Sequence, residues 1–182
     1  MSGKAVLVID MLNDFLKGSM KNERASKIIS PLEKLLQAAR AKAVPVIYCN
    51  DAHLKGIDKE LLIWGEHALA GTEGAEVIAE LKPLPGDYVI PKRRYSGFFQ
   101  TALRLLLEEL AIDTLIVTGL LVSICVRHTV ADAFYRGYRI YIPGDAVEDL
   151  TEEAYQRGLD EMARLYAAQL TSVEEIIKGF AA

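Results

Sequence analysis

Three residues with reactive side chains follow short apolar runs, and their types suggest covalent catalysis by a thiol. Asp10 ends the first such run, Lys92 follows another, and Cys125 lies six residues beyond Gly119. The run 114–118 stops just before that glycine, so Cys125 is expected near the first turn of a helix. Backbone N–H groups and the helix dipole there stabilise a thiolate and a developing oxyanion. Taken singly, Asp10 equally fits a helix cap, Lys92 a solvated lysine, and Cys125 an inert packed thiol.

A second group of residues has the composition of a metal site. Asp51 and His53 stand two residues apart after an apolar run, and His67 follows downstream. One extended segment would present an oxygen and a nitrogen, and the second histidine would complete three ligands with one coordination position open. The same residues equally fit a polar loop. His128, one helical turn beyond Cys125, is a general-base candidate or, more simply, a partly exposed helix residue.

The elements that would position these residues alternate in type. Apolar runs typical of buried strands occupy residues 5–9, 45–49, 88–90, 114–118 and 139–142. Helical spacing of apolar residues occurs at 28–39, 103–110, 122–134, 152–166 and 172–177. Strands separated by helices of about 10 to 15 residues indicate right-handed crossovers and a parallel sheet. We therefore predict an α/β fold: a single-domain, three-layer α/β/α structure with a mostly parallel, doubly wound sheet, over residues 1–182.

Two local features refine this pattern. Ser30-Pro31-Leu32-Glu33 resembles a capping box with proline at the first helical position, although the apolar stripe already starts at Ile28. Residues 51–74 form a long polar stretch with a weak helical run at 60–64. A loop of this length is usually functional, and it follows a strand at the sheet edge where ligands bind. We expect all the reactive residues to converge at that edge.

Composition narrows the choice of partners. The chain has 182 residues, of which 25% are charged, and its net charge is −4. Such a chain lacks the basic field that attracts phosphate backbones, and Lys92-Arg93-Arg94 is too short to supply one, so we expect no nucleic-acid partner. No pattern typical of a secretion signal or a membrane span is found, which favours a cytoplasmic protein without membrane association. In a reducing cytosol Cys49 and Cys125 would both be free thiols.

A series of ordered segments carries a family resemblance. In chain order they are VIDMLNDF at 8–15, DAH at 51–53, His67 before GTEGAE at 71–76, KRRYSGF at 92–98, GLLVSICV at 119–126, TVADA at 129–133 and DA at 145–146. Together they resemble the cysteine hydrolases of the isochorismatase-like superfamily, which includes nicotinamidases and N-carbamoylsarcosine amidases. The resemblance covers nearly the whole chain, and the ordered set is far more specific than any single segment.

The resemblance implies a reaction and roles for these residues. Cys125 would attack the carbonyl of a small carboxamide or carbamoyl compound, forming a thioester as the C–N bond breaks. Asp10 would act as general base, and Lys92 would hold that carboxylate charged and favour the thiolate. The backbone N–H groups of Leu121 and Cys125 would bind the oxyanion, beside a cis peptide bond expected at Leu120-Leu121.

The resemblance also implies a metal, a pocket and an assembly. Asp51, His53 and His67 would bind zinc or another divalent metal that positions the substrate, and no organic cofactor is implied. The candidates for the walls of an aromatic pocket, each of which equally fits ordinary core, are Phe15, Trp64, Tyr95 and Phe98. Because members of the superfamily tend to associate, we expect a homo-oligomer, either a dimer or a tetramer.

Three positions depart from the family pattern and keep alternatives open. Ala52 stands where nicotinamidases tend to carry an aromatic residue, Ala102 where an aspartate is frequent, and Val122 where a threonine is usual. They leave room for altered specificity, or for a catalytically impaired or engineered binding scaffold of the same fold. Vinyl-ether hydrolysis of the isochorismatase kind is a further alternative. That chemistry uses no cysteine nucleophile, so Cys125 argues against it.

Overall fold

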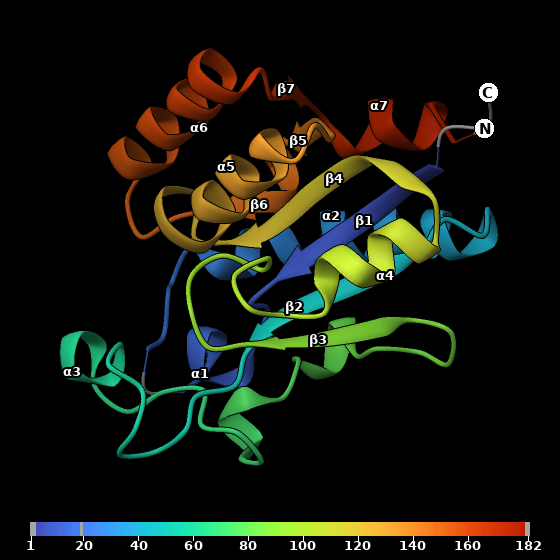
Figure 1. Ribbon diagram of the computed structural model, residues 1–182. Coiled ribbons are helices and arrows are strands. Elements are labelled where there is room, and N and C mark those ends of the chain that lie inside the picture. Colours follow the sequence, from blue (N-terminus) through green and yellow to red (C-terminus); the bar gives the residue numbers. More distant parts are fainter. Residues whose placement is uncertain (1–2, 19, 181–182) are drawn as a thin grey trace.

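The computed structural model describes residues 3–18 and 20–180, which are built around one parallel sheet. Its strands are β1 (Gly3–Ile9), β2 (Val46–Asp51), β3 (Tyr88–Lys92), β4 (Ile112–Leu120), β5 (Arg139–Pro143), β6 (Val147–Glu148) and β7 (Gln169–Thr171). Their order is β3-β2-β1-β4-β5-β7, with β6 beside β4, and every pairing is parallel. The predicted α/β class and parallel sheet are confirmed (Figure 1).

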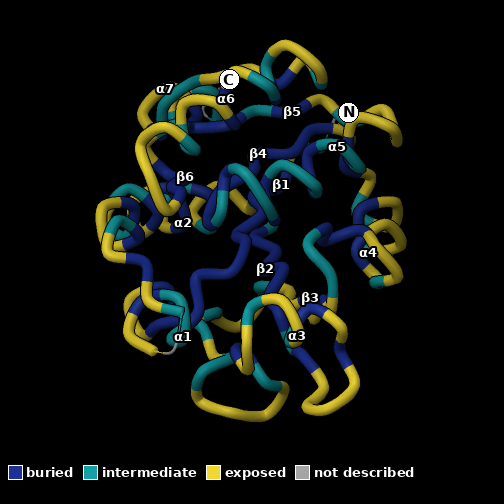
Figure 2. The backbone as a smooth tube through the Cα atoms, turned by 90° about the vertical axis from the view of Figure 1, so that its left-hand side faces the viewer, coloured by how far each residue is buried: buried dark blue, intermediate teal, exposed yellow. Residues whose placement is uncertain are grey.

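Helices cover both faces of the sheet, because the buried strands are apolar on both sides. They are α1 (Asn13–Leu16), α2 (Ile29–Ala41), α3 (Leu61–Trp64), α4 (Leu103–Glu109), α5 (Arg127–Tyr135), α6 (Glu152–Tyr166) and α7 (Val173–Lys178). In β1, Leu7 and Ile9 belong to the core under α4, α5 and α6, whereas Val6 and Val8 belong to the core under α2 and α7. Figure 2 shows the central strands buried and the connecting loops exposed.

The helix starts only partly follow the sequence signals. Thr151 caps α6 by accepting a hydrogen bond from Ala154 N at 3.1 Å. The capping box expected at residues 30–33 is wrong, because the chain already turns through a 3-10 segment (Ala25–Ile28) and α2 begins at Ile29 without a side-chain cap. That segment buries Ala25 and Ile28 against the core, so packing sets this helix start.

The strand order reverses beside β1, and this places the candidate site. The chain proceeds from β1 outward to β2 and β3, then returns to the opposite side of β1 as β4. In open parallel sheets, ligands bind at the carboxyl ends of the strands flanking such a reversal.

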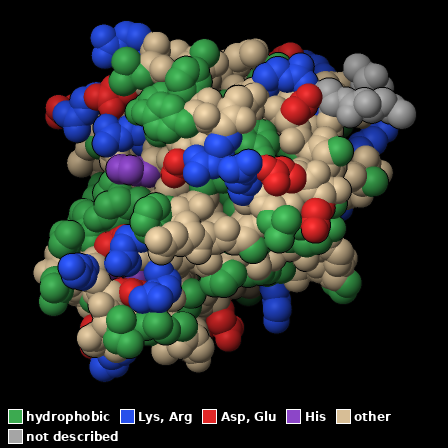
Figure 3. All heavy atoms as spheres, in the orientation of Figure 1, with side chains coloured by type: hydrophobic (Ala, Val, Ile, Leu, Met, Phe, Trp, Pro, Cys, Tyr) green, Lys and Arg blue, Asp and Glu red, His purple; other side chains and the backbone are tan. Residues whose placement is uncertain are grey.

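On the face shown in Figure 3, acidic and basic side chains are interspersed with apolar ones. None of the helices within the described ranges is long and apolar enough to cross a membrane.

Candidate active site

Four strand ends deliver the chemically reactive side chains to one edge of the sheet. Asp10 follows β1, while Asp51 and Lys92 are the last residues of β2 and β3 and face each other in the ladder between those strands. Cys125 follows β4 in a single π-helical turn (Val122–Val126), from which the chain continues into α5. The convergence expected from the sequence is therefore present in the fold.

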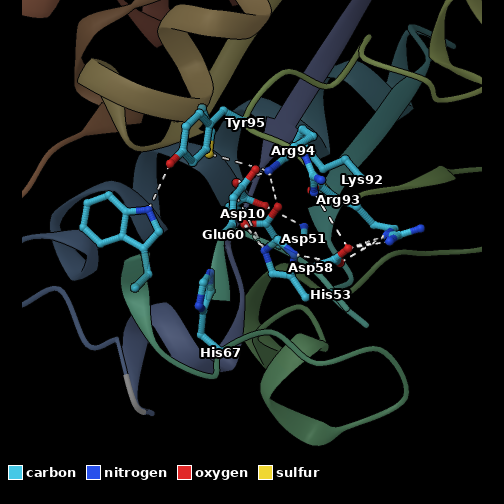
Figure 4. A network of polar contacts seen from close by, with 12 residues as sticks. Asp10, Asp51, His53, Asp58, Glu60, His67, Lys92, Arg93, Arg94 and Tyr95 are labelled. Atoms are coloured by element: carbon cyan, nitrogen blue, oxygen red, sulfur yellow. Dashed lines mark hydrogen bonds and ion pairs between the residues drawn. The ribbon is translucent and has the colours of Figure 1, made fainter. Parts of the chain in front are cut away.

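Lys92 is the centre of a buried cluster of charges and the thiol. Its Nζ lies 2.7 Å from Asp10 Oδ2, 2.6 Å from Asp51 Oδ1 and 3.6 Å from Cys125 Sγ. The Asp51 backbone N–H donates to Asp10 Oδ1 at 2.8 Å, which fixes the first carboxylate relative to the second. Lys92 is only 1% exposed, so the alternative of a solvated surface lysine is wrong. Figure 4 shows its side chain directed between the two carboxylates.

The electrostatics of the cluster favour a neutral thiol beside a charged carboxylate. Burial, helped by Asp51 and opposed by Lys92, raises the pKa of Asp10 to about 6. Burial opposes the charge on Lys92, but Asp10 and Asp51 outweigh it and hold the Lys92 pKa well above its usual range. Burial also raises the pKa of the Cys125 thiol, and Lys92 offsets this only in part. The structure thus favours the neutral thiol of Cys125 over the thiolate anticipated from the helix position.

The turn before Cys125 is held by close backbone contacts. The Leu120-Leu121 peptide bond is cis, and the Leu121 carbonyl accepts hydrogen bonds from Ile124 N and Val126 N at 3.0 and 3.1 Å. Asp149 Oδ2 accepts a hydrogen bond from Ser123 N at 2.6 Å. The turn therefore has a defined shape beside the thiol.

Two glycines allow the close approach of neighbouring backbone around this turn. Gly119 has φ +100°, and a Cβ there would lie 2.0 Å from the carbonyl oxygen of Ile9, the residue before Asp10. Gly158 of α6 leaves room for Val122, whose Cγ1 would be 2.6 Å from a Cβ at that position. Val122 is fully buried there, so its side chain belongs to the packing beneath the turn.

The loop after β2 folds back and assembles the three residues expected to bind metal. His53 forms a bridge with Leu69, in which His53 N donates to Ala68 O and Ala70 N donates to His53 O, each at 2.9 Å. This pairing brings His67 beside His53, with ring centroids 4.8 Å apart. One donor atom from each of Asp51, His53 and His67 lies within 4.8 Å of the other two. Three buried side chains of the types that bind zinc thus surround one position.

The hydrogen bonds of the two histidines suit metal binding. His53 Nδ1 contacts Asp58 Oδ2 at 3.2 Å, and His67 Nδ1 donates to the Gly65 carbonyl at 2.8 Å. Acceptors at both Nδ1 atoms leave the Nε2 lone pairs available, which is the usual arrangement of metal-bound histidines. His53 Nε2 is buried without any hydrogen-bond partner. The donor set therefore fits a divalent ion such as zinc.

Sequence reasoning missed two carboxylates at this centre, Asp58 and Glu60. Arg93 Nε donates to both oxygens of Asp58, at 2.9 and 3.1 Å, and this bonding holds the Asp58 pKa well below its usual range. Glu60 Oε2 lies 3.9 Å from His53 Nε2, and its Oε1 is buried without a hydrogen-bond partner. Both belong to the polar stretch whose length predicted function, but only the folded loop shows what they contact.

An apolar pocket opens above Cys125. Its apolar and aromatic walls are Phe15, Met20, Trp64, Tyr95, Leu120, Leu121, Ile124 and Leu150. The Trp64 indole N–H donates to the Tyr95 hydroxyl at 3.1 Å across this space. Phe15, Trp64 and Tyr95 thus lie where the sequence placed them. The expectation for Phe98 is wrong, because its ring is 5% exposed and packs in the core against Tyr138, 5.8 Å away between centroids.

His128 and Cys49 both have surroundings that suit a structural role. His128 Nδ1 donates to the Ile124 carbonyl at 2.7 Å, and its ring packs against Tyr95 with centroids 5.3 Å apart. This supports the simpler interpretation of His128 as a helix residue. Cys49 lies in the core, where burial raises its thiol pKa to about 12. Of the two thiols, only that of Cys125 lines the pocket.

Comparison with known proteins assigns the chain and its fold to a family. The isochorismatase domain matches residues 4–175. The chain belongs to the isochorismatase family. Among solved relatives of this isochorismatase-family protein, N-carbamoylsarcosine amidase from Thermoplasma acidophilum is 40% identical, with a TM-score of 0.89 and coverage of 94% of this chain and 97% of that one.

Two other solved structures extend the range of the likeness. Nicotinamidase from Bacillus subtilis is 31% identical, with a TM-score of 0.88 and coverage of 93% of this chain and 99% of that one. Pyrazinamidase from Pyrococcus horikoshii, solved in complex with zinc, is 26% identical, with a TM-score of 0.86 and coverage of 93% and 98%. The relatives are thus named for different substrates, and the choice among them depends on the pocket of this chain.

Proposed function

We propose that this isochorismatase-family protein hydrolyses the C–N amide bond of a small carboxamide or carbamoyl compound through a thioester on Cys125. The observation that carries the proposal is the buried contact of a carboxylate, an ammonium and a thiol: Lys92 lies 2.7 Å from Asp10 and 3.6 Å from Cys125, and the last two line an apolar pocket. The relatives named as amidases support the class of bond.

The acylation half-reaction uses Asp10 twice. As Cys125 Sγ attacks the carbonyl carbon, Asp10 takes the thiol proton, because the thiol is neutral and the carboxylate is largely charged at pH 7. The backbone N–H groups of Leu121 and Cys125 hold the negative charge that develops on the carbonyl oxygen. Asp10 then gives its proton to the departing nitrogen, so ammonia or an amine leaves and the thioester remains.

The second half-reaction restores the thiol. Asp10 takes a proton from a water molecule as that water attacks the thioester carbonyl. The C–S bond breaks, the acid product leaves, and the proton returns to Cys125. Lys92 keeps its charge throughout and stabilises the carboxylate that must accept and release the proton.

Asp51, His53 and His67 are the residues that would hold a divalent metal in this proposal. Zinc bound by these residues would supply a Lewis acid to orient a nitrogen or oxygen atom of the substrate. The zinc complex of the pyrazinamidase relative supports this assignment. Asp58 would keep His53 in the tautomer that ligation needs, since it accepts at Nδ1.

Ammonia release from a panel of carboxamides and N-carbamoyl compounds tests the proposal, with and without added zinc. Wild type, Cys125→Ala and Cys49→Ala are compared, because both substitutions remove a buried thiol but only one thiol faces the pocket. We expect turnover by wild type and Cys49→Ala and its loss in Cys125→Ala. An absence of turnover with every compound would favour an inactive scaffold, and full activity of Cys125→Ala would refute the thioester route.

A further inference from the structure

The pocket above Cys125 contains no lysine or arginine side chain among the described residues that line it. Most of its walls are apolar or aromatic, Asn22 and His67 add polar side chains, and its carboxylates are Asp10, Asp51 and Glu60. A substrate that carries its own carboxylate would have to leave water without meeting a cation. Burial of an unpaired charge of this kind is strongly unfavourable.

Three basic residues of one segment, 92–94, lie near the pocket without lining it. Lys92 lies beneath the pocket floor, within 2.7 Å of two carboxylates that outnumber it. Arg93 donates to both oxygens of Asp58. Arg94 Nη1 lies 3.8 Å from the same Asp58 carboxylate. Figure 4 shows Arg93 directed toward Asp58 and away from the pair formed by Asp10 and Lys92.

Glu60 adds to the negative character of the pocket. It is 6% exposed, it lines the pocket, and its Oε1 has no hydrogen-bond partner. A divalent ion held by Asp51, His53 and His67 would bring two positive charges, and Asp51 and Glu60 would match them. Among the described residues that line the pocket, the carboxylates therefore outnumber lysine and arginine when no ion is bound, and Asp51 and Glu60 balance the charge of a divalent ion.

We infer that the pocket selects neutral carboxamides and carbamoyl compounds and rejects amides that carry a carboxylate group. The inference rests on the proposed amidase function and adds the substrate class. It separates this chain from any amidase whose substrate is an N-carbamoyl amino acid, despite the 40% identity to an N-carbamoylsarcosine amidase.

Binding of matched neutral and anionic compounds tests the inference without depending on turnover. The probes are isophthalamide against 3-carbamoylbenzoate, and the methyl ester of N-carbamoylsarcosine against the free acid. Each is titrated by calorimetry into Cys125→Ala, first with a chelator and then with zinc. We expect the neutral member of at least one pair to bind at least about tenfold more tightly, from one uncompensated charge at an effective dielectric near 20. Equal or tighter binding of the acids, or no binding by either neutral compound, overturns the inference.

A charge placed at the pocket rim supplies the complementary test. Leu150 lines the pocket and is 49% exposed, so Leu150→Arg adds a cation at a position that tolerates a polar side chain. We expect the ratio of anionic to neutral binding to rise about tenfold. Leu150→Gln at the same position, and Leu170→Arg on the 45% exposed Leu170 of β7, should leave the ratio unchanged. An unchanged ratio of anionic to neutral binding in Leu150→Arg counts against the inference.

Turnover by the wild type distinguishes this inference from the proposed function. Ammonia release from the acids at rates matching the neutral compounds would refute the selectivity and leave the amidase intact. Selective binding of the neutral compounds without ammonia release would refute the amidase and leave the selectivity of the pocket standing.

Discussion

Replacing Lys92 with methionine should cost stability in a way that depends on pH. Lys92 is buried between Asp10 and Asp51, at 2.7 and 2.6 Å, and methionine has a similar length without the charge. Removing one partner of a buried ion pair typically costs about 3–5 kcal/mol, because the remaining charge is left uncompensated. We expect a loss of this size in the free energy of unfolding at pH 8, measured by urea denaturation.

The pH dependence follows from the direction of the Asp10 shift. Burial already raises its folded-state pKa to about 6, above an unfolded value near 3.8, and loss of Lys92 raises it further. The folded protein then holds its proton more tightly than the unfolded chain. The penalty is present above the folded pKa and disappears as pH falls toward the unfolded one. The gap between wild type and Lys92→Met should therefore shrink between pH 8 and pH 5, by about 1.4 kcal/mol for each unit by which the substitution raises the Asp10 pKa.

Two further variants of this protein serve as controls for the experiment. Lys55→Met removes a surface lysine that lies 2.9 Å from Glu66, and it should lose less than about 1 kcal/mol at both pH values. The double variant Lys92→Met/Asp10→Asn lacks one of the uncompensated charges. It should recover part of the lost stability but no activity. A loss as small as that of Lys55→Met, or one that is equal at pH 5 and pH 8, would refute the description of the cluster.

Three other changes have defined outcomes. The rate constant kcat/KM should fall as pH drops through about 6, because Asp10 must be charged to take the thiol proton, and a pH–rate profile will show this. Asp58→Asn should weaken zinc binding about 10- to 100-fold in a chelator competition, since Asp58 orients His53. Gly119→Ala should lower both stability and activity, because the new methyl group would meet the Ile9 carbonyl oxygen that precedes Asp10.

Each of these three predictions has a control variant or an outcome that would contradict it. A rate that stays constant from pH 5 to pH 8 would contradict Asp10 as the base. Asp87→Asn disrupts a distant carboxylate paired with Arg40, and it should leave zinc affinity unchanged. Gly86→Ala shares the φ of +100° but has no atom within 4 Å of the added Cβ, so its loss of stability should be much smaller than that of Gly119→Ala. Equal losses would rule out the clash as the cause.

The strands that carry the site were predictable because their burial leaves a simple apolar signal. Residues 5–9, 45–49, 88–90, 114–118 and 139–142 all lie within observed strands or overlap them by all but one residue. The two strands that were missed, β6 and β7, have two and three residues. Runs this short have no readable periodicity, and their pairing depends on neighbours far away in the sequence.

The site was predictable where chemistry follows a strand and not where it depends on a folded loop. Asp10, Asp51 and Lys92 could be placed because parallel strands end at one edge. Glu60 could not, since its contact with the metal-binding residues arises only when the loop turns back. Phe98 belongs to the same segment, residues 92–98, as Tyr95, but its ring packs in the core. Spacing in the sequence does not fix the direction in which a side chain points.

In the proposed reaction, the substrate passes through a thioester on Cys125. Acid quenching during turnover of the best neutral amide, followed by intact-mass and peptide analysis, measures this directly. We expect an acyl adduct on the peptide that contains Cys125, heavier than the free peptide by the mass of the amide minus ammonia, and no such adduct in Cys125→Ala. Steady ammonia release by Cys125→Ala, or an adduct on another residue, would contradict it.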